Sequence, residues 1–314
     1  MEKILEEVTG AKSIGITGHI RPDGDCVGAC LAMYQYLKKT MPEDTVIDTI
    51  LETPGDEFRC IKGFDEIRPY PRRQAYDVFM VIDTVPERTG DAVHGYEKAK
   101  KTINIDHHLT SEAKSDVNYI FPTASSASEL VFELLDREYL DADIAKALYI
   151  GIIHDTGVLQ YSNTAPKTLR AVAELVEYGF DFPSIIDETF YQKTYLQNQL
   201  LGRALTESIV FNDHKCIVAA IDLKTLKFYG ATSNDLSGIV NQLRYTKGTE
   251  VAIFMYELEP LKWKVSLRTN TDINLSEVAA YFGGGGHAKA SGFTINGNFY
   301  DAVNNISDRL ALLM

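Results

Sequence analysis

Cysteine and long apolar runs are scarce in this sequence of 314 residues, and their scarcity excludes several classes of protein. The four cysteines show no CxxC pair and no regular framework, so we expect reduced thiols in a cytoplasmic protein. No run approaches the length of about 18 apolar residues that a membrane-spanning helix needs. The acidic N-terminus, MEKILEE, lacks the basic and then apolar pattern of a signal peptide.

Positive charge is also in short supply, because 44 Asp and Glu residues outnumber 31 Lys and Arg residues and leave a net charge of −13. This balance argues against a long, non-specific track for nucleic acid, which needs a basic surface. It does not argue against a dinucleotide, since bound divalent ions can offset acidic charge locally. The hydrophobic content of 45% and the charged content of 24% are typical of a soluble globular protein long enough for two domains.

Apolar runs and helical periodicity alternate along the first half of the chain, which predicts an α/β fold with a doubly wound parallel sheet. We expect strands over 12–17, 45–51, 77–82 and 102–105, and helices over 26–39, 125–139, 141–154 and 165–178. A second, smaller α/β domain should follow, with strands over 214–221, 251–256 and 263–267 and helices over 235–244 and 275–281. The predicted boundaries are 1–185 for the first domain, 186–208 for a helical linker and 209–314 for the second domain.

Four separated segments carry carboxylate or imidazole groups. They are His19, Asp23 and Asp25 in GHIRPDGD, Asp83 after an apolar strand, Asp106-His107-His108 after the next strand, and Asp155 after a helix. Most of these residues follow the carboxyl end of a predicted strand, where the ligand sites of open parallel sheets gather. Taken alone, GHIRPDGD is also compatible with a polar turn and an N-capping Asp25, and His107-His108 with an ordinary surface pair.

Three histidines and five aspartates exceed what one metal ion needs, so we expect two ions bridged by a shared carboxylate. Mixed Asp and His ligation favours Mn²⁺, with Mg²⁺ or Co²⁺ as alternatives, over structural zinc. Such a pair lowers the pKa of a bound water and stabilises a phosphoryl group under attack. Phosphoester hydrolysis is the reaction that this set of residues fits best.

The second domain contains the run Gly283, Gly284, Gly285, Gly286 and His287, followed by Lys289. Glycines without Cβ atoms let backbone amides approach a phosphate closely, although a flexible loop produces the same string. Arg268, at the end of a predicted strand, is a candidate for a bidentate phosphate contact or a solvated surface charge.

These motifs together resemble the DHH phosphoesterase superfamily. GHIRPDGD, Asp83, Asp106-His107-His108 and GIIHDTG look like its four motifs in order, and GGGGHAKASG resembles its DHH-associated C-terminal subdomain. The length and spacing look most like the branch of stand-alone oligoribonucleases (nanoRNases) and pAp phosphatases. The resemblance covers nearly the whole chain.

The resemblance implies a role for each site residue. One metal ion would be held by His19, Asp23 and Asp83, and the other by Asp25, Asp83, His107 and Asp155. His108 would face the phosphate and help the leaving oxygen, while Asp106 would orient its neighbours. Arg268, His287 and the glycines Gly283–Gly286 would bind the nucleotide, and the two domains would close over short substrates.

The predicted activity is therefore hydrolysis of short RNA oligonucleotides and of the 3′-phosphate of pAp. The alternatives are a phosphodiesterase for pApA or cyclic di-AMP, and a non-catalytic nucleotide-binding regulator. Family II pyrophosphatases share the metal motifs but lack the GGGGH string, and RecJ-type exonucleases are longer and need a basic track. A homodimer is compatible with the sequence, and no membrane partner is expected.

Overall fold

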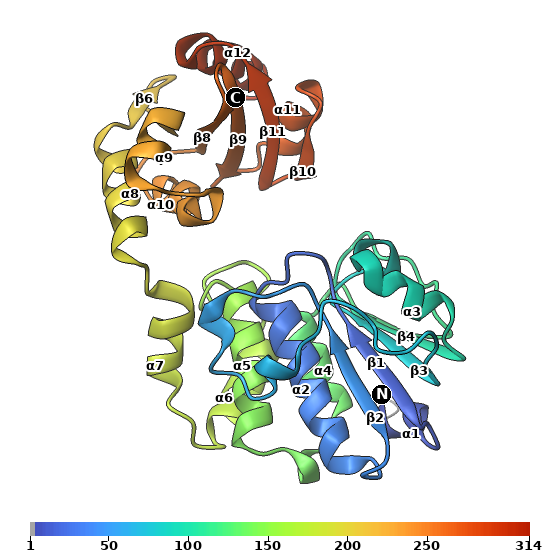
Figure 1. Ribbon diagram of the computed structural model, residues 1–314. Coiled ribbons are helices and arrows are strands. Elements are labelled where there is room, and N and C mark those ends of the chain that lie inside the picture. The colour runs from blue at the N-terminus through green and yellow to red at the C-terminus, as the bar shows by residue number, and fades with distance from the viewer. Residues whose placement is uncertain (1–3) are drawn as a thin grey trace. The chain divides into compact units, whose positions relative to one another are not determined.

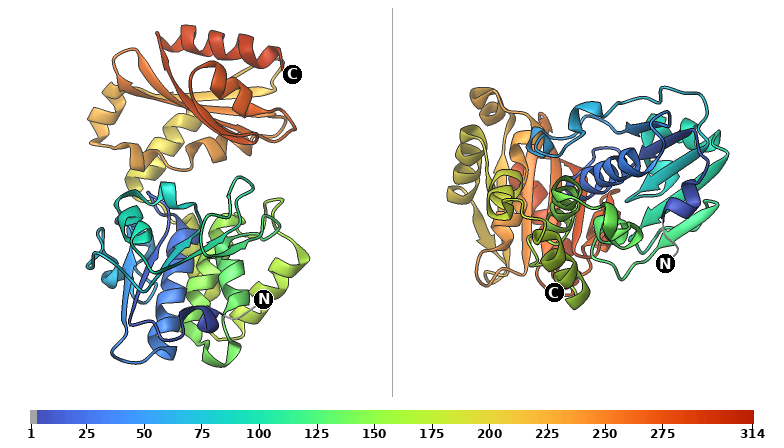
Figure 2. Two further views of the ribbon diagram at one scale, coloured as in Figure 1. Left: turned by 90° about the vertical axis from the view of Figure 1, so that its right-hand side faces the viewer. Right: turned by 90° about the horizontal axis from the view of Figure 1, so that it is seen from below.

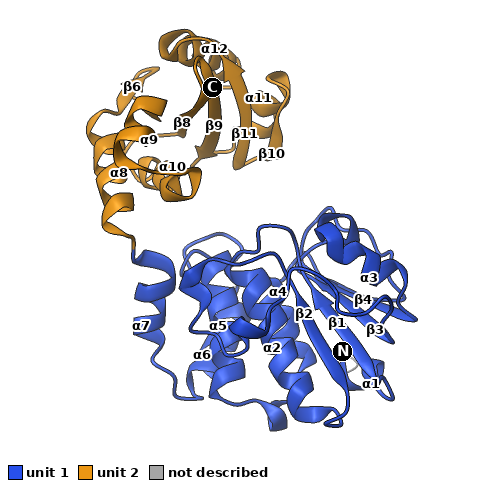
Figure 3. Ribbon diagram, in the orientation of Figure 1, with its two compact units in different colours: residues 1–192 blue, residues 193–314 orange. Residues whose placement is uncertain are grey.

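The computed structural model describes residues 4–314, and the chain divides into two compact units between Gln192 and Lys193 (Figure 1, Figure 3). Residues 1–3, the start of the acidic N-terminus, lie outside the described part. The boundaries expected at 185 and 209 stay predictions. Helix α8 (Tyr195–Thr206), which falls in the predicted linker, lies within unit 2, where Leu200 and Ala204 are fully buried. Among the described residues, no helix has the length and apolar character needed to cross a membrane.

A parallel sheet of five strands in the order β2-β1-β3-β4-β5 forms the centre of unit 1, which confirms the predicted doubly wound fold class. Its strands are β1 (Ser13–Thr17), β2 (Val46–Ile50), β3 (Val78–Ile82), β4 (Lys101–Asp106) and β5 (Val117–Ile120). Every residue of β3 is buried because the sheet has a hydrophobic core on both faces. Met80 faces the larger core and Phe79 the smaller one.

Helices cover both faces of this sheet. They are α1 (Ile4–Val8), α2 (Gly24–Thr40), α3 (Val93–Glu97), α4 (Ala127–Leu134), α5 (Ala142–Asp155), α6 (Pro166–Val176) and α7 (Phe182–Ile186), followed by a π-helical turn at Asp187–Tyr191. Helices α2, α4 and α5 lie along one face and α3 along the other (Figure 1, Figure 2). The larger core therefore lies beneath α2, which directly follows the GHIRPDGD segment.

Two predictions for unit 1 were wrong. The helix expected over 125–139 ends at Leu134, after which Leu135 and Asp136 are extended and Arg137–Tyr139 forms a 3₁₀ turn. Strand β5 was missed, because its four residues include a polar Asn118 and give too short an apolar run. The chain reaches β5 through residues 107–116, which contain no helix and begin with His107.

Unit 2 contains a mixed six-stranded sheet in the order β10-β11-β9-β8-β7-β6. Its strands are β6 (Ile209–Phe211), β7 (Cys216–Ile221), β8 (Val251–Glu259), β9 (Lys262–Thr269), β10 (Gly285–His287) and β11 (Ala290–Asn296). Its helices are α8, α9 (Leu223–Tyr229), α10 (Ile239–Arg244), α11 (Leu275–Tyr281) and α12 (Phe299–Ala311). Helices α8 and α10 pack on one face and α11 and α12 on the other, so unit 2 has its own two cores.

The elements of unit 2 were predicted less completely. Strands β6, β10 and β11 and helices α9 and α12 were not predicted. The helix expected over 235–244 is interrupted at Gly238, whose φ of +83° separates a 3₁₀ turn from α10. The strand expected from His214 begins at Cys216, because residues 212–214 adopt positive φ angles in a turn.

Candidate metal centre

The candidate site lies at the carboxyl ends of β1, β3 and β4. The order β2-β1-β3 means that the chain leaves β1 toward one side and later returns to the other, so a topological switch point lies between β1 and β3. His19 follows β1, Asp83 directly follows β3, and His107 directly follows β4. Parallel pairing of these strands brings three segments that are far apart in the sequence to one edge.

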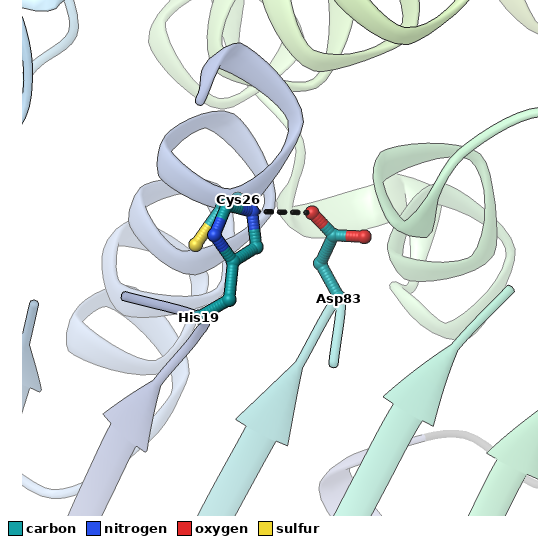
Figure 4. A group of neighbouring side chains, drawn as sticks. All are labelled: His19, Cys26 and Asp83. Carbon is teal, nitrogen blue, oxygen red and sulfur yellow. Dashed lines mark ion pairs between the residues drawn. The ribbon is translucent and has the colours of Figure 1, made fainter. Parts of the chain in front are cut away.

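His19 and Asp83 face one another across the switch point (Figure 4). The Nε2 atom of His19 lies 3.5 Å from Oδ2 of Asp83 and 3.6 Å from Oδ1 of Asp23. Its Nδ1 atom donates to the carbonyl oxygen of Ile20 at 2.9 Å, which fixes the orientation of the ring. Burial lowers the pKa of His19, but the bonds to Asp23 and Asp83 outweigh burial and raise it to about 12.

The same Asp83 carboxylate also faces His107. Oδ1 of Asp83 lies 3.3 Å from Nε2 of His107, which is itself 3.6 Å from Oδ2 of Asp155 and 3.9 Å from Oδ2 of Asp25. Asp83 has a φ of +63°, a conformation in which Asp and Asn are enriched among residues other than glycine. Its Oδ1 atom is buried and accepts no hydrogen bond from the described residues, so it is available to a cation.

Asp25 is held by the first turn of α4. Its carboxylate accepts the backbone N–H of Ala127 at 2.6 Å and of Ser128 at 2.9 Å. Gly151 of α5 packs directly against Ser128 and the Asp25 carboxylate, where a Cβ atom would collide with both. Burial, together with the neighbouring charges of Asp83 and Asp155, raises the pKa of Asp25 well above its usual range. Gly151, the first residue of GIIHDTG, thus leaves room for this carboxylate.

Asp106 is fully buried, and both of its carboxylate oxygens accept hydrogen bonds from its own loop. It accepts the backbone N–H of His107 at 2.7 Å and of His108 at 3.2 Å, as well as the hydroxyl of Ser111. The Nδ1 atom of His108 lies 2.7 Å from Oδ1 of Asp106, and this bond raises the pKa of His108. Asp106 therefore orients both histidines. His108 also lies close enough to Asp83 and His107 to share a cation with them.

Asp155 ends α5 with its carboxylate directed at the site, and Asn163 donates to its backbone carbonyl at 3.1 Å. Burial raises the pKa of Asp155 to about 6. The preceding His154 lies outside the cluster, between the rings of Phe58 and Phe190, and its Nε2 is 3.1 Å from the Thr189 hydroxyl. Burial lowers the pKa of His154 to about 4.

These residues suit divalent cations. Three groups of ligand atoms lie within 4.8 Å of one another: His19, Cys26 and Asp83; Asp83, His107 and His108; Asp25, His107 and Asp155. Carboxylates that face each other in a buried site repel. Burial lowers the pKa of His107, but the neighbouring carboxylates of Asp83, Asp25 and Asp155 outweigh burial and raise this pKa to about 10. Cations can replace the protons that balance this charge, and carboxylate and imidazole are side chains that divalent cations take as ligands in proteins.

Cys26 is a site residue that the sequence did not indicate. Its thiol is fully buried on the first turn of α2 and lies in the same group as His19 and Asp83. The four cysteines are free, as expected, but spacing alone gave no reason to associate one of them with the site. Ser111 and Asn163 were also missed, because they belong to no motif and support the cluster only by hydrogen bonds to Asp106 and Asp155, respectively.

The predicted substrate-binding residues of unit 2 lie on β9 (Arg268), on β10 (Gly285, Gly286 and His287) and on the turn before β10 (Gly283 and Gly284). Ala290 of β11 pairs with His287 on one side and with Arg268 on the other, so His287 and Arg268 occupy one row across the sheet. His287 is exposed, and Arg268 donates through Nη1 to the carbonyl of Leu267 at 2.9 Å.

The glycine run is partly a packing feature rather than a free loop. A Cβ atom on Gly284 would collide with the backbone of β11, and Gly286 has a φ of +140° that only glycine adopts easily. Gly283 also has a positive φ, of +74°, whereas Gly285 borders open space. The amide site for phosphate at Gly283–Gly286 stays a prediction.

Comparison with known proteins agrees with this architecture. Residues 13–152 match the model of the DHH family, N-terminal domain, and residues 213–312 match that of the DHHA1 domain. A Bacillus subtilis protein named "Bifunctional oligoribonuclease and PAP phosphatase NrnA" is 28% identical over 93% of this chain and 92% of its own length. A Thermus thermophilus protein of the same name is 29% identical over 94% and 87%, respectively.

One solved structure has the same fold over nearly the full length. The crystal structure of an exopolyphosphatase-related protein from Bacteroides fragilis matches with a TM-score of 0.89 and 25% identity. The match covers 99% of this chain and 96% of that one. The order of both units along the chain is therefore shared with a protein of known structure.

Proposed function

Since the chain belongs to the DHH superfamily of phosphoesterases, we propose that it hydrolyses short RNA oligonucleotides and removes the 3′-phosphate of pAp. The main support is that a single carboxylate, Asp83, faces both His19 and His107 at the sheet's switch point. A shared carboxylate between two ligand groups is the feature that dinuclear phosphoesterases need. The substrate classes follow those in the names of the two relatives at 28% and 29% identity.

Two divalent ions would be held by overlapping residue sets, with His19, Asp23 and Asp83 in one and Asp25, Asp83, His107 and Asp155 in the other. We propose Mn²⁺ as the ion, with Mg²⁺ or Co²⁺ as substitutes, because the donors are mainly oxygen and imidazole nitrogen. When bound, such ions activate water and neutralise charge on a phosphoryl group. The buried Asp83 Oδ1, with no hydrogen bond of its own from residues 4–314, supports this assignment.

His108 is the proposed proton donor to the leaving oxygen. Its Nδ1 is engaged by Asp106 at 2.7 Å, so its Nε2 is the ring atom that faces a substrate. The bond to Asp106 raises the pKa of His108, which favours the protonated ring that a proton donor at Nε2 requires. Asp106 acts as a positioning residue, because its oxygens already accept hydrogen bonds from both histidines and from Ser111.

Unit 2 is proposed to bind the nucleotide through Arg268, His287 and the glycines Gly283–Gly286. The row formed by His287, Ala290 and Arg268 places an imidazole and a guanidinium on the two strands that flank β11, a spacing suited to a phosphate and its sugar. The proposed location of the enzyme is the cytoplasm.

The test is relative kcat/KM, with Mn²⁺, on pAp, an RNA pentamer, pApA, cyclic di-AMP and pyrophosphate. The proposal expects the highest values for pAp and the pentamer. A preference for pApA or cyclic di-AMP would favour the phosphodiesterase alternative, and a preference for pyrophosphate would refute the assignment. No turnover, together with fewer than about two Mn²⁺ ions per chain, would favour a binding protein.

A further inference from the structure

Two adjoining pockets in unit 1 form a groove that begins at the candidate metal centre. The first pocket is lined by His19 and by Glu52, Tyr70 and Asp91. The second shares Tyr70 and Asp91 with the first. Its other polar walls are Arg73, Gln74, His94 and Lys98, and we call the two pockets together the Tyr70 groove.

The loop that carries Tyr70 and Arg73 is tied to β2 on both sides of these residues. On one side, the backbone of Arg68 donates to Thr49 at 3.0 Å and accepts from Leu51 at 2.9 Å. On the other side, buried Asp48 accepts the Tyr76 hydroxyl at 2.9 Å, and Nε of Arg72 lies 3.5 Å from it. The loop is therefore fixed, and it leaves the Tyr70 side chain 64% exposed.

The far pocket is basic. Within residues 4–314, the exposed Arg73 and Lys98 have no ion-pair partner, whereas nearby Lys100 is paired with Asp77 at 2.7 Å. His94 lies one turn before Lys98, on the same face of α3, and is 3.6 Å from Glu97. Arg73 and Lys98 line one pocket of about 350 Å³, so both charges can act on the same ligand. They suit an anionic ligand, of which a phosphodiester is the class this enzyme meets.

The near pocket has the opposite character. Its carboxylates, Glu52 and Asp91, disfavour a phosphate but can accept hydrogen bonds from ribose hydroxyls. Glu52 is held in place because its Oε2 accepts the backbone N–H of Arg21, which lies in the GHIRPDGD segment. The exposed ring of Tyr70 lies where the two pockets meet and offers a stacking surface for a base.

We propose that the Tyr70 groove holds the nucleotide beyond the scissile bond of an oligoribonucleotide. The ribose lies between Glu52 and Asp91, the base stacks on Tyr70, and Arg73 and Lys98 neutralise the next phosphate. This inference rests on the proposed function and adds the part of the surface that distinguishes an oligonucleotide from pAp. Because pAp contains a single nucleoside, it does not reach the groove.

The test compares the double variant Arg73→Gln/Lys98→Gln with the wild type on an RNA pentamer and on pAp. We expect kcat/KM for the pentamer to fall roughly tenfold and that for pAp to stay within about twofold. The dependence of log kcat/KM on log salt should lose a slope of about 0.7, because the two cations neutralise one phosphate and each single-strand phosphate contact contributes about 0.7. The matched control is Lys38→Gln/Arg170→Gln, which removes the same charge from exposed positions on α2 and α6. It should leave kcat/KM unchanged for both substrates.

Tyr70 is tested separately. Tyr70→Ala should lower kcat/KM for the pentamer roughly tenfold, and Tyr70→Phe, which keeps the ring, should stay within about twofold of the wild type. The proposal would be overturned if the groove variants lost kcat/KM equally for pAp and the pentamer, or if their kcat/KM for the pentamer were unchanged.

The outcome is separable from failure of the proposed function. If the wild type cleaves neither substrate, the proposed function fails. Fluorescence anisotropy of a labelled pentamer in EDTA then still tests the groove. Weaker binding by Arg73→Gln/Lys98→Gln, but not by the Lys38/Arg170 control, supports the groove, and equal binding by all three refutes it.

Discussion

Replacing Asp83 by Asn changes the carboxylate on which the assignment of two cation sites most depends. The substitution removes one charge and preserves the shape of the side chain. Asn is also among the residues that most readily adopt a positive φ, so the backbone at +63° should be retained. Asp83→Ala would confuse loss of the carboxylate with strain in the turn after β3, which makes Asn the sharper choice.

The expected effect is large because Asp83 serves both sides of the centre. Its two oxygens lie 3.5 Å from His19 and 3.3 Å from His107, so both proposed cation sites lose a negatively charged ligand together. A loss of about 4 kcal/mol of transition-state stabilisation, within the range for metal catalysis, corresponds to a decrease of about 10³-fold in kcat/KM. Bound Mn²⁺ should fall below about two ions per chain, measured by plasma emission after gel filtration.

Asp77→Asn is the matched control, because Asp77 precedes the same strand whose other end Asp83 follows. Asp77 pairs with Lys100 and accepts the backbone N–H groups of Lys12 and Ser13, far from the metal ligands in the sheet. The Lys100 bond, with the Lys12 amide, lowers the pKa of Asp77 to about 2. This variant should keep its metal and its activity. An Asp83→Asn protein that binds two ions and retains activity within about tenfold of the wild type would refute the shared-ligand assignment.

Four further outcomes are expected. Removing metal with EDTA should lower Tm, and Mn²⁺ at about 100 times its Kd should restore about 2.7 kcal/mol of unfolding free energy; unchanged calorimetric scans would contradict a metal site in the folded state. The pKa of Asp77 is lowered in the folded protein, so its carboxylate contributes its full stabilisation of the fold above the unfolded pKa of about 3.9 and loses it as the pH falls toward 2. Asp77→Asn should flatten that part of an acid-unfolding curve followed by circular dichroism. Gly151→Ala should displace the Asp25 carboxylate and weaken Mn²⁺ binding about tenfold, as measured by titration calorimetry. The control Gly28→Ala, whose Cβ would press on the same α2–α5 contact without touching Asp25, should lower stability only. Equal metal affinities in the two variants would count against the role of Gly151. His287→Ala should raise KM for the pentamer and leave metal content at the wild-type level, and an unchanged KM would remove His287 from the nucleotide site.

The parts of the fold that could be predicted are those in which a local pattern is long and unambiguous. The apolar run of β3 ends in Asp83, and a helix begins within GHIRPDGD as expected. The N-capping role considered for Asp25 was wrong, because the cap is Asp23, whose Oδ1 accepts the amides of Asp25 and Cys26. Both features are written in neighbouring residues. Strand β10 is different, because three residues that include two glycines become a strand only by pairing with β11.

The sequence by itself determined the chemistry that this protein can perform, because the types of side chain after each strand are local facts. It identified a carboxylate and imidazole set and a family whose members share it. Only the tertiary structure decided which of these side chains meet. Asp25 meets the amide of Ala127, 102 residues away, and Cys26 lies near Asp83.

The physical reason is strand order. Local periodicity indicates that β3 is a buried strand, but not that it pairs with β1, and this pairing is what places Asp83 beside His19. The Tyr70 groove has the same origin. Tyr70 lies on the loop before β3 and Lys98 on the segment before β4, with no common motif, and their shared pocket exists because both segments lie beside the same sheet.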